Sequence, residues 1–325
     1  MKKFSILFLL LASGLLAKYD NCDFINQDYE DICKKVVKDG VSYRYANEFL
    51  LSYFKTKKFD EVTWKLIQPS KIKYHREREK KANNTLVKYV PKMVENLKEY
   101  KEVYDAAEQK YGVNREIIAA ILLKETKLGL IKPKHDAFIV FNTILTRTNP
   151  KTSREKWLHR MSKTNMAAII EHCYKKGVKP EQCILPSSYA GAVGIPQFMP
   201  NSFVYADSYK NRVADLNTME DAIMSVAKFL HKKAGFDTLM DFSKIEDIAK
   251  IEEGWYEYAY RHDNASFVYE KSRSGKVYSC FTKDSPELEY LKNYVKKIMR
   301  YNNSSNYAIG VIRLAYEAHK GLKEE

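Results

Sequence analysis

The sequence predicts a mainly α protein, formally α+β with minor β, and three observations lead to this fold class. Its 325 residues contain only 12 Gly and 9 Pro, fewer turn formers than β-sandwiches or propellers usually need. Apolar residues recur at helical spacing over long stretches, whereas strand-like patterns are short, at 266–269 and 276–280. A hydrophobic fraction of 45% supplies a core and argues against a chain that is disordered as a whole.

Helical periodicity places the expected elements along the chain. Patterns at 27–68 and 86–111 predict a helical N-terminal region. A further helix is predicted over 114–127, with Asn114 as its N-cap and Gly129 as its C-terminal stop. Helices are also expected at 221–233, 286–301 and 307–320.

Residues 1–17 have the layout of an export signal. Two lysines precede an apolar run over 4–16, and Ala17 can occupy the small position before a cleavage site. A buried N-terminal helix is the alternative interpretation. No later stretch approaches the roughly 18 apolar residues of a membrane span. We therefore expect a signal peptide cleaved near Ala17 and a periplasmic mature protein without an integral membrane span.

The net charge of +14 favours an anionic partner such as nucleic acid, lipid headgroups or an acidic polymer. Export makes nucleic acid the least favoured of these. A generally solvated lysine-rich surface explains the charge equally well. The strongly basic segment 71–81 is accordingly interpreted as a solvated loop or helix face rather than a specific anion site.

The five cysteines suit an oxidising compartment. Two pairs lie close in sequence, Cys22 with Cys33 and Cys173 with Cys183, and bridging both would leave Cys280 free; the sequence leaves this connectivity open. No C-x-x-C occurs and the seven histidines lack metal-binding spacing such as H-E-x-x-H. We predict neither a metal site nor a cofactor.

The most informative residue is Glu125. It continues the apolar stripe formed by Ile118, Ile121 and Leu122, where helical spacing calls for another apolar side chain. Burial in such surroundings raises the pKa of a carboxyl group. A carboxylic acid that stays protonated near neutral pH is suited to general-acid cleavage of a glycosidic bond. A structural glutamate satisfied by a Lys, an Arg or a helix terminus is the alternative.

Two other segments combine residues suited to ligand contact. In SSYAGAVGIPQFMP at 187–200, small residues and glycines would let the backbone approach a ligand closely. The same segment offers the amide of Gln197 and the ring of Phe198. The second segment, RYNNSSNYA at 300–308, contributes amide and phenol groups from Tyr301, Asn302 and Tyr307.

Three motifs together resemble the lytic murein transglycosylase B family. They are YGVNREIIAAILLKETKLG at 111–129, SYAGAVGIPQFMPNSF at 188–203 and RYNNSSNYA at 300–308. Their order, spacing and combined length make a chance match improbable. The resemblance covers about 111–316 well and 18–110 only loosely.

This resemblance implies a lysozyme-like, mostly helical catalytic region over 111–325, preceded by the signal at 1–17 and a helical region at 18–110. Glu125 matches the single acid/base of the family. Ser188 and Asn302 match polar residues that contact the N-acetyl group or orient the reacting sugar. The residues that match the substrate groove are Gln197, Phe198, Tyr301 and Tyr307, and Phe229 falls where the family often has an aromatic.

The implied substrate is the peptidoglycan glycan strand, and the implied reaction cleaves the β-1,4 bond between N-acetylmuramic acid and N-acetylglucosamine without water. Glu125 would protonate the glycosidic oxygen while the neighbouring N-acetyl group assists at C1. The ionised Glu125 would then take a proton from the C6 hydroxyl, which attacks C1 to form a 1,6-anhydro sugar.

The sequence departs from the family pattern in three places. Leu128 replaces a frequent aromatic, and the family's aromatic is missing before Pro150. The family can also carry a calcium loop after the second motif. The corresponding stretch 207–218 has Tyr209 at a ligand position and Arg212 where Gly is needed, and Thr218 replaces the closing acid, so we predict no calcium there.

Two alternatives to a lytic transglycosylase remain open. A muramidase-type hydrolase on the same scaffold would activate water with a second carboxylate, for which Asp136 and Asp207 are the candidates. A non-catalytic murein-binding scaffold is the other possibility. Glu125 argues against it, because a protein that only binds gains nothing from a buried acid.

Overall fold

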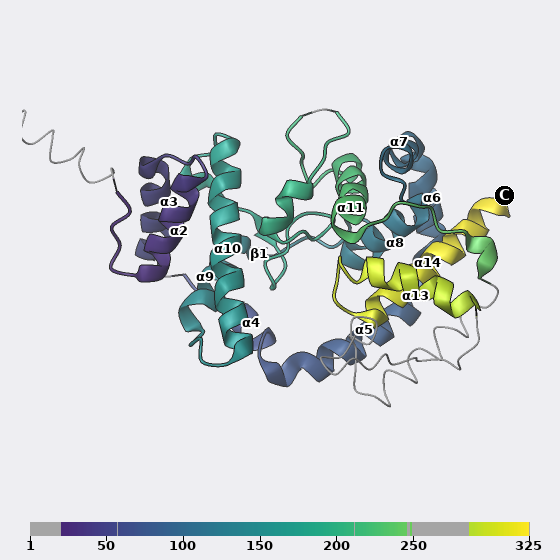
Figure 1. Ribbon diagram of the computed structural model, residues 1–325, viewed down its shortest axis with the longest axis horizontal. Coiled ribbons are helices and arrows are strands. Elements are labelled where there is room, and N and C mark those ends of the chain that lie inside the picture. The colour runs from purple at the N-terminus through teal and green to yellow at the C-terminus, as the bar shows by residue number, and fades with distance from the viewer. Residues whose placement is uncertain (1–20, 57, 211, 246–247, 249–285, 325) are drawn as a thin grey trace, which may run out of the picture. The chain divides into compact units, whose positions relative to one another are not determined.

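A computed structural model describes residues 21–56, 58–210, 212–245, 248 and 286–324 (Figure 1). Helices dominate the described residues, so the prediction of a mainly α fold is confirmed. The predicted signal peptide, Cys280 and the strand-like segments at 266–269 and 276–280 lie outside the described residues. In the part of the chain that is described, no helix is both long enough and apolar enough to cross a bilayer.

The chain forms two compact units, and each unit draws on separate parts of the sequence. The first unit contains the described residues up to Ile67 together with Pro133–Val193 and Phe198–Phe203. The second contains Gln68–Lys132, Gly194–Gln197 and the described part of Val204–Glu325. These units are defined by packing. The division into 18–110 and 111–325, which concerns function, stays a prediction.

The first unit is built from helices and a two-stranded antiparallel sheet. In the sheet, β1 (His135–Asp136) pairs with β2 (Pro186–Ser187), and His135 lies opposite Ser187. Helix α10 packs against α9 and α2. The helices are α2 (Gln27–Lys38), α3 (Tyr43–Thr56), α4 (Glu61–Leu66), α9 (Ala137–Arg147) and α10 (Ser153–Lys175), with a 3-10 turn η4 at Pro180–Gln182 and the start of another, η5, at Pro200–Tyr205.

Local sequence explains where α9 and α10 begin, and two disulfides link α2 and α10 to neighbouring segments of the chain. The carboxylate of Asp136 caps α9 by accepting from the amides of Phe138 and Ile139, which satisfies two of the free N–H groups of the first turn. A capping box between Thr152 and Glu155 starts α10. The disulfides join Cys22 to Cys33 and Cys173 to Cys183, the two pairs that the sequence allowed.

The second unit is an assembly of helices around α8 (Arg115–Thr126), which carries Glu125. Helix α14 packs against α8, α6 and α5, and α11 packs against α7 and α8. The remaining elements are η2 (Pro69–Lys71), α5 (Ile72–Leu86), η3 (Val87–Tyr89), α6 (Val90–Glu99), α7 (Lys101–Tyr111), α11 (Met219–Ala234), η6 (Phe242–Lys244), α13 (Pro286–Ile298) and α14 (Ser305–Lys323). The basic segment 71–81 is therefore largely helical.

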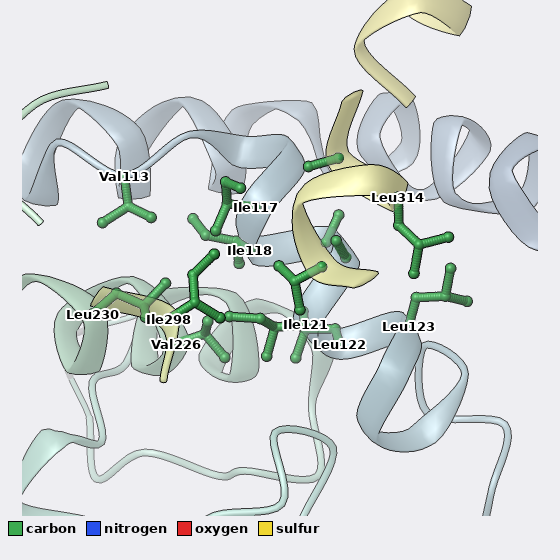
Figure 2. Packing of buried hydrophobic residues seen from close by; sticks show 14 of the residues in the cluster. Val113, Ile117, Ile118, Ile121, Leu122, Leu123, Val226, Leu230, Ile298 and Leu314 are labelled. Atoms are coloured by element: carbon green, nitrogen blue, oxygen red, sulfur yellow. The ribbon is translucent and has the colours of Figure 1, made fainter. Parts of the chain in front are cut away.

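Helix α8 is buried along most of its length (Figure 2). Ile117, Ile118 and Ile121 have no exposed surface, and apolar side chains of α11, α13 and α14 surround them. Full burial of one such side chain stabilises the fold by about 1.5–3 kcal/mol. Because several neighbouring helices hold α8, the backbone that carries Glu125 has little freedom to move.

The bounds of this helix agree with the predicted range 114–127 to within one residue, but the interactions at its two ends differ from those expected. Asn114 precedes α8 but does not cap it with its side chain, because the amide instead donates to and accepts from the backbone of Met240 (3.0 and 2.6 Å). The helix also ends before Gly129, since Lys127 and Leu128 already take left-handed backbone conformations (φ 51° and 58°). Their amides bond back to Leu123 and Leu122, which closes the last turn.

Candidate active site

Glu125 lies in the last turn of α8, directly beyond the buried apolar stripe predicted from the sequence. Its side chain is partly exposed, so it is accessible to a ligand and yet bordered by apolar groups. The pKa of Glu125 is raised to about 7, chiefly by burial and in smaller part by the negative charge of Glu79. A hydrogen bond from Tyr307 and the charge of Lys124 act in the opposite direction. The carboxyl group therefore titrates near neutral pH.

Tyr307 orients this carboxyl group. Its hydroxyl donates to Oε1 of Glu125 at 2.7 Å, and its ring is 3% exposed in the first turn of α14. Ser304 fixes the start of that helix by accepting from the amide of Tyr307 at 3.1 Å. Burial and the nearby Glu125 carboxylate raise the pKa of Tyr307 well above its ordinary value, so the phenol stays protonated and acts as a donor.

Thr126 connects the end of α8 to the middle of the second motif. Its hydroxyl donates to the carbonyl of Ile195 at 2.9 Å and accepts from the amide of Gly129 at 3.0 Å. The residue beside the acid thus binds the short segment 194–197, which belongs to the same unit. This contact explains why a threonine next to Glu125 is structurally useful.

Tyr301 holds the same segment from the third motif. Its hydroxyl donates to the carbonyl of Pro196, and its ring meets Phe229 edge-on at a centroid distance of 4.9 Å. Phe229 is only 4% exposed and also contacts the ring of Tyr205. Parts of all three motifs, at 125–126, 194–197 and 301–307, therefore converge within the second unit.

Gln197 ends this segment in a left-handed backbone conformation (φ 51°), which is uncommon for a residue other than glycine. Its backbone and side-chain amides both donate to the carbonyl of Gly194, at 3.2 and 2.9 Å. The partly exposed side chain is thereby fixed in one orientation. Strained backbone of this kind is concentrated at functional sites.

Three other predicted site residues, Ser188, Phe198 and Asn302, take no part in the hydrogen bonds and ring contacts described above. Ser188 and Phe198 belong to the first unit, where the Ser188 hydroxyl accepts from the amide of Ala192 at 3.3 Å and Phe198 is 2% exposed. Asn302 is partly exposed in the turn before α14, and its carbonyl accepts from the amide of Ser304. Their roles toward substrate, like those of the other site residues, stay predictions.

At least one glycine of the second motif, Gly194, is required by the fold, and the expected close approach of a ligand to this segment stays a prediction. A Cβ at Gly194 (φ 73°) would lie 2.6 Å from the carbonyl oxygen of Leu216. The amide of Ile195 donates to that same carbonyl at 2.8 Å. Glycine is needed at position 194 because two backbone segments pass in contact there.

Three residues around the acid were missed by the sequence analysis: Lys124, Glu79 and Asn83. The side chain of Lys124 is 3% exposed; its ammonium lies 3.7 Å from Oε1 of Glu79 and donates to Oδ1 of Asn83. Helical spacing offered a signal, because Lys124 continues the buried row of Ile117 and Ile121 just as Glu125 continues its own. Glu79 and Asn83 are four residues apart on one face of α5. They lie in or next to the strongly basic segment 71–81, which the sequence alone indicates to be solvated, so neither residue was recognised as a partner of the site.

The loop at 207–218 is organised by a protein carboxylate. Asp221 has no exposed surface and accepts from the hydroxyl of Ser208 (3.1 Å) and from the amides of Tyr209 and Asp215 (3.1 and 2.8 Å). Arg212 lies 3.6 Å from the same group. Among the residues that the structure describes, no three His, Cys, Asp or Glu side chains are grouped so as to hold a metal ion.

The model of a protein family described as the transglycosylase SLT domain matches residues 25–316. No curated protein matches the chain. Several solved structures do resemble it.

The lytic transglycosylase Slt35 of Escherichia coli, in complex with bulgecin A, is 18% identical, with 93% of this chain and 96% of that one covered and a TM-score of 0.60. The soluble lytic transglycosylase SltB1 of Pseudomonas aeruginosa is 20% identical, with coverages of 91% and 99% and a TM-score of 0.58. SltB3 of the same organism, in complex with NAG-anhNAM-pentapeptide, is 15% identical, with coverages of 92% and 80% and a TM-score of 0.58. Such likeness concerns the fold, and it confirms the predicted lysozyme-like architecture.

Proposed function

Because the chain belongs to the transglycosylase SLT domain family and is by that membership a lytic transglycosylase, we propose that it cleaves peptidoglycan glycan strands with Glu125 as the single acid and base. The cleaved bond is the β-1,4 linkage between N-acetylmuramic acid and N-acetylglucosamine. The new end is a 1,6-anhydro sugar. The observation that carries this proposal is a partly exposed carboxyl group with a pKa of about 7, oriented by a buried phenol.

An acid with this pKa is suited to both halves of the reaction. Protonated Glu125 donates to the glycosidic oxygen as the bond to C1 breaks. Tyr307 donates to Oε1, so it stabilises the carboxylate that this transfer leaves behind. The carboxylate then takes the proton of the C6 hydroxyl while that oxygen attacks C1. Glu125 thus donates one proton to the glycosidic oxygen and accepts one from the C6 hydroxyl, and no water enters the products.

The substrate class has support from a neighbour. SltB3 of P. aeruginosa was solved with NAG-anhNAM-pentapeptide, a fragment that contains an anhydro sugar. The fold of this chain resembles that protein over 92% of its length. Within the second unit, Gln197, Phe229, Tyr301 and Asn302 are the residues that we propose to line or support the glycan groove. For Ser188 and Phe198, the proposed contact with the glycan rests on the motif resemblance alone.

A muramidase-type hydrolase on this scaffold is less well supported, because the two carboxylates considered as water-activating bases have other roles. Asp136 caps α9 in the first unit. Asp207 accepts from the Tyr111 hydroxyl and from Lys110. Although burial acts to raise the pKa of Asp207, the contacts with Tyr111 and Lys110 lower it below its ordinary value, which makes this carboxylate a weak base.

We also propose that the protein is exported to the periplasm, where peptidoglycan lies. The two disulfides support this location, because such bonds persist in oxidising compartments. The layout of residues 1–17 supports it independently.

Digestion of purified murein sacculi by the mature protein tests the function. Mass spectrometry after borohydride reduction separates the products, because reducing ends gain hydrogen and 1,6-anhydro ends do not. We expect anhydro ends from the wild type and from Glu102→Gln, a matched control at an exposed position of α7. Glu125→Gln should bind sacculi but release nothing. Reducing ends, or turnover by Glu125→Gln, would contradict the proposal.

A further inference from the structure

The described contacts of Glu125 lead to a second carboxylate, Glu79, on the neighbouring helix α5. Its Oε1 lies 3.7 Å from the ammonium of Lys124, the residue directly before the acid. The side chain of Lys124 is 3% exposed and that of Glu79 is 23% exposed. A buried ammonium needs a nearby anion and hydrogen-bond acceptors, because its desolvation is otherwise very unfavourable.

Lys124 in turn contacts the phenol that orients the acid. Its ammonium lies 4.9 Å from the centroid of the Tyr307 ring, within the range of a cation–π interaction. The Tyr307 hydroxyl is the group that donates to Glu125 at 2.7 Å. A continuous series of contacts therefore runs from Glu79 through Lys124 and Tyr307 to Glu125.

Asn83 fixes the other end of this arrangement. Its Oδ1 accepts from Lys124, and its Nδ2 donates to the carbonyl of Asn306 at 2.8 Å, one residue before Tyr307. Gly310 makes room for it, because a Cβ there would lie 2.2 Å from Oδ1 of Asn83. Helix α5 thus holds both Lys124 and the backbone beside Tyr307.

We propose that Glu79 and Lys124 form a partly buried charge pair that positions Tyr307 and sets the proton affinity of Glu125. This proposal rests on the function proposed above, since it concerns the same acid. Glu79 is a positioning residue: it acts through Lys124 and by its charge, and it does not touch the glycan. The catalytic centre would then depend on α5, which precedes residue 111 and which the sequence assigned only to a helical N-terminal region.

The two members of the pair act on Glu125 with opposite signs. The described groups whose charge or hydrogen bonding bears on the acid are Glu79 from α5, Lys124 from α8, Tyr307 from α14 and Tyr301 from the turn before α14. Negative charge on Glu79 raises the pKa of Glu125, and positive charge on Lys124 lowers it. Removing Glu79 alone should therefore lower that pKa, and removing Lys124 alone should raise it.

The pH dependence of kcat/KM on sacculi separates this role from a purely structural one. An essential acid must be protonated, so activity falls on the alkaline side as Glu125 ionises. We expect this alkaline limb to move to lower pH in Glu79→Gln, to higher pH in Lys124→Met, and to lie near its wild-type position in the double variant. Beyond the limb, a shift of about half a unit changes kcat/KM about three-fold, because the protonated fraction falls tenfold per unit.

Three controls keep the outcome interpretable. Glu77→Gln removes the same charge from an exposed position of α5 and should leave the limb unmoved. Thermal melting reports on folding; if Lys124→Met fails to fold, the milder Glu79→Gln variant carries the test alone. Glu125→Gln is assayed in parallel to report on the proposed function itself.

If Glu79→Gln and Lys124→Met fold and their alkaline limbs stay at the wild-type pH while Glu125→Gln is inactive, the inference is overturned and the proposed function stands. Complete loss of turnover in folded Glu79→Gln at every pH would also overturn it, since Glu79 would then take part in the chemistry. Turnover by Glu125→Gln would instead refute the proposed function. Limbs that shift in opposite directions, with anhydro products unchanged, would support the pair.

Discussion

The substitution Tyr307→Phe removes a single oxygen from the site. The ring stays in its buried position, with its contact to Lys124, and Glu125 loses the 2.7 Å hydrogen bond to Oε1. A hydrogen bond to a charged group contributes about 1.5–3 kcal/mol. A bond to a neutral partner contributes roughly half as much. The difference, about 1 kcal/mol, is the part that favours the carboxylate over the acid.

That difference has two measurable consequences. At a pH well below the alkaline limb, the transition state loses about 1 kcal/mol of stabilisation as Glu125 becomes anionic, so kcat should fall about five-fold. The hydrogen bond lowers the pKa of Glu125, so its loss should move the limb to higher pH, by less than about one unit. The variant should therefore recover relative to the wild type as pH rises.

The assay is the initial rate of release of soluble fragments from sacculi between pH 4 and 9. Tyr316→Phe, at a partly buried position of the same helix, is the matched control and should match the wild type. Melting temperatures exclude a general loss of structure. A limb that moves to lower pH, or an unchanged kcat, would refute the assignment of Tyr307 as the donor that stabilises the ionised acid.

Three further outcomes follow from the contacts. Gly310→Ala should displace Asn83, because the new Cβ would lie 2.2 Å from Oδ1; we expect thermal unfolding to report a loss of about 1–3 kcal/mol and sacculus turnover to fall with it. Calcium should leave the melting temperature unchanged, because Asp221 already organises the 207–218 loop through protein donors; a calcium-dependent rise would contradict this. Glu125→Gln should stabilise the fold above pH 7 and leave its stability unchanged at pH 4. The gain above pH 7 is at most about 3 kcal/mol, and solvent access to the side chain reduces it. Denaturant titrations at the two pH values would measure the difference.

The sign of that last effect follows from linkage. The pKa of Glu125 is higher in the folded protein, at about 7, than its ordinary value of 4.5. The contribution of Glu125 to the free energy of unfolding is therefore fully present below pH 4.5 and is lost as the pH rises towards 7. An amide at position 125 does not ionise and avoids this loss.

Local pattern was sufficient to predict the helical fold class and to single out Glu125. Helical spacing depends only on neighbouring residues, and an acid on an apolar face stands out within two turns. The bounds of α8 were predicted to within one residue, but the hydrogen bonds at its termini were not, because their partners are distant in the sequence. The Asn114 side chain bonds to Met240, 126 residues away, and the hydroxyl of Thr126 bonds to Ile195 beyond the helix end.

The interleaved units and the contacts of α5 with Lys124 could not be predicted from the sequence for the same reason. The chain leaves the first unit at Ile67 and returns at Pro133, and although a proline lies near each point, prolines such as Pro91 and Pro150 occur within a unit and so do not mark such a boundary. Glu79 looks like one exposed charge among many in a basic helix. Only the packing of α5 against α14 places it beside Lys124.

The balance of forces on Glu125 supports the proposal that this one residue acts first as acid and then as base. Apolar burial alone favours the protonated form, which donates readily but recovers a proton poorly. A fully solvated carboxylate is ionised near neutral pH, so it can accept a proton but has none to donate. Here burial and Glu79 act against Tyr307 and Lys124, and the result is a pKa of about 7. A group that must first give and then take a proton works best when neither form dominates strongly at the working pH. The polar contacts around the acid are therefore as necessary to the proposed reaction as its burial.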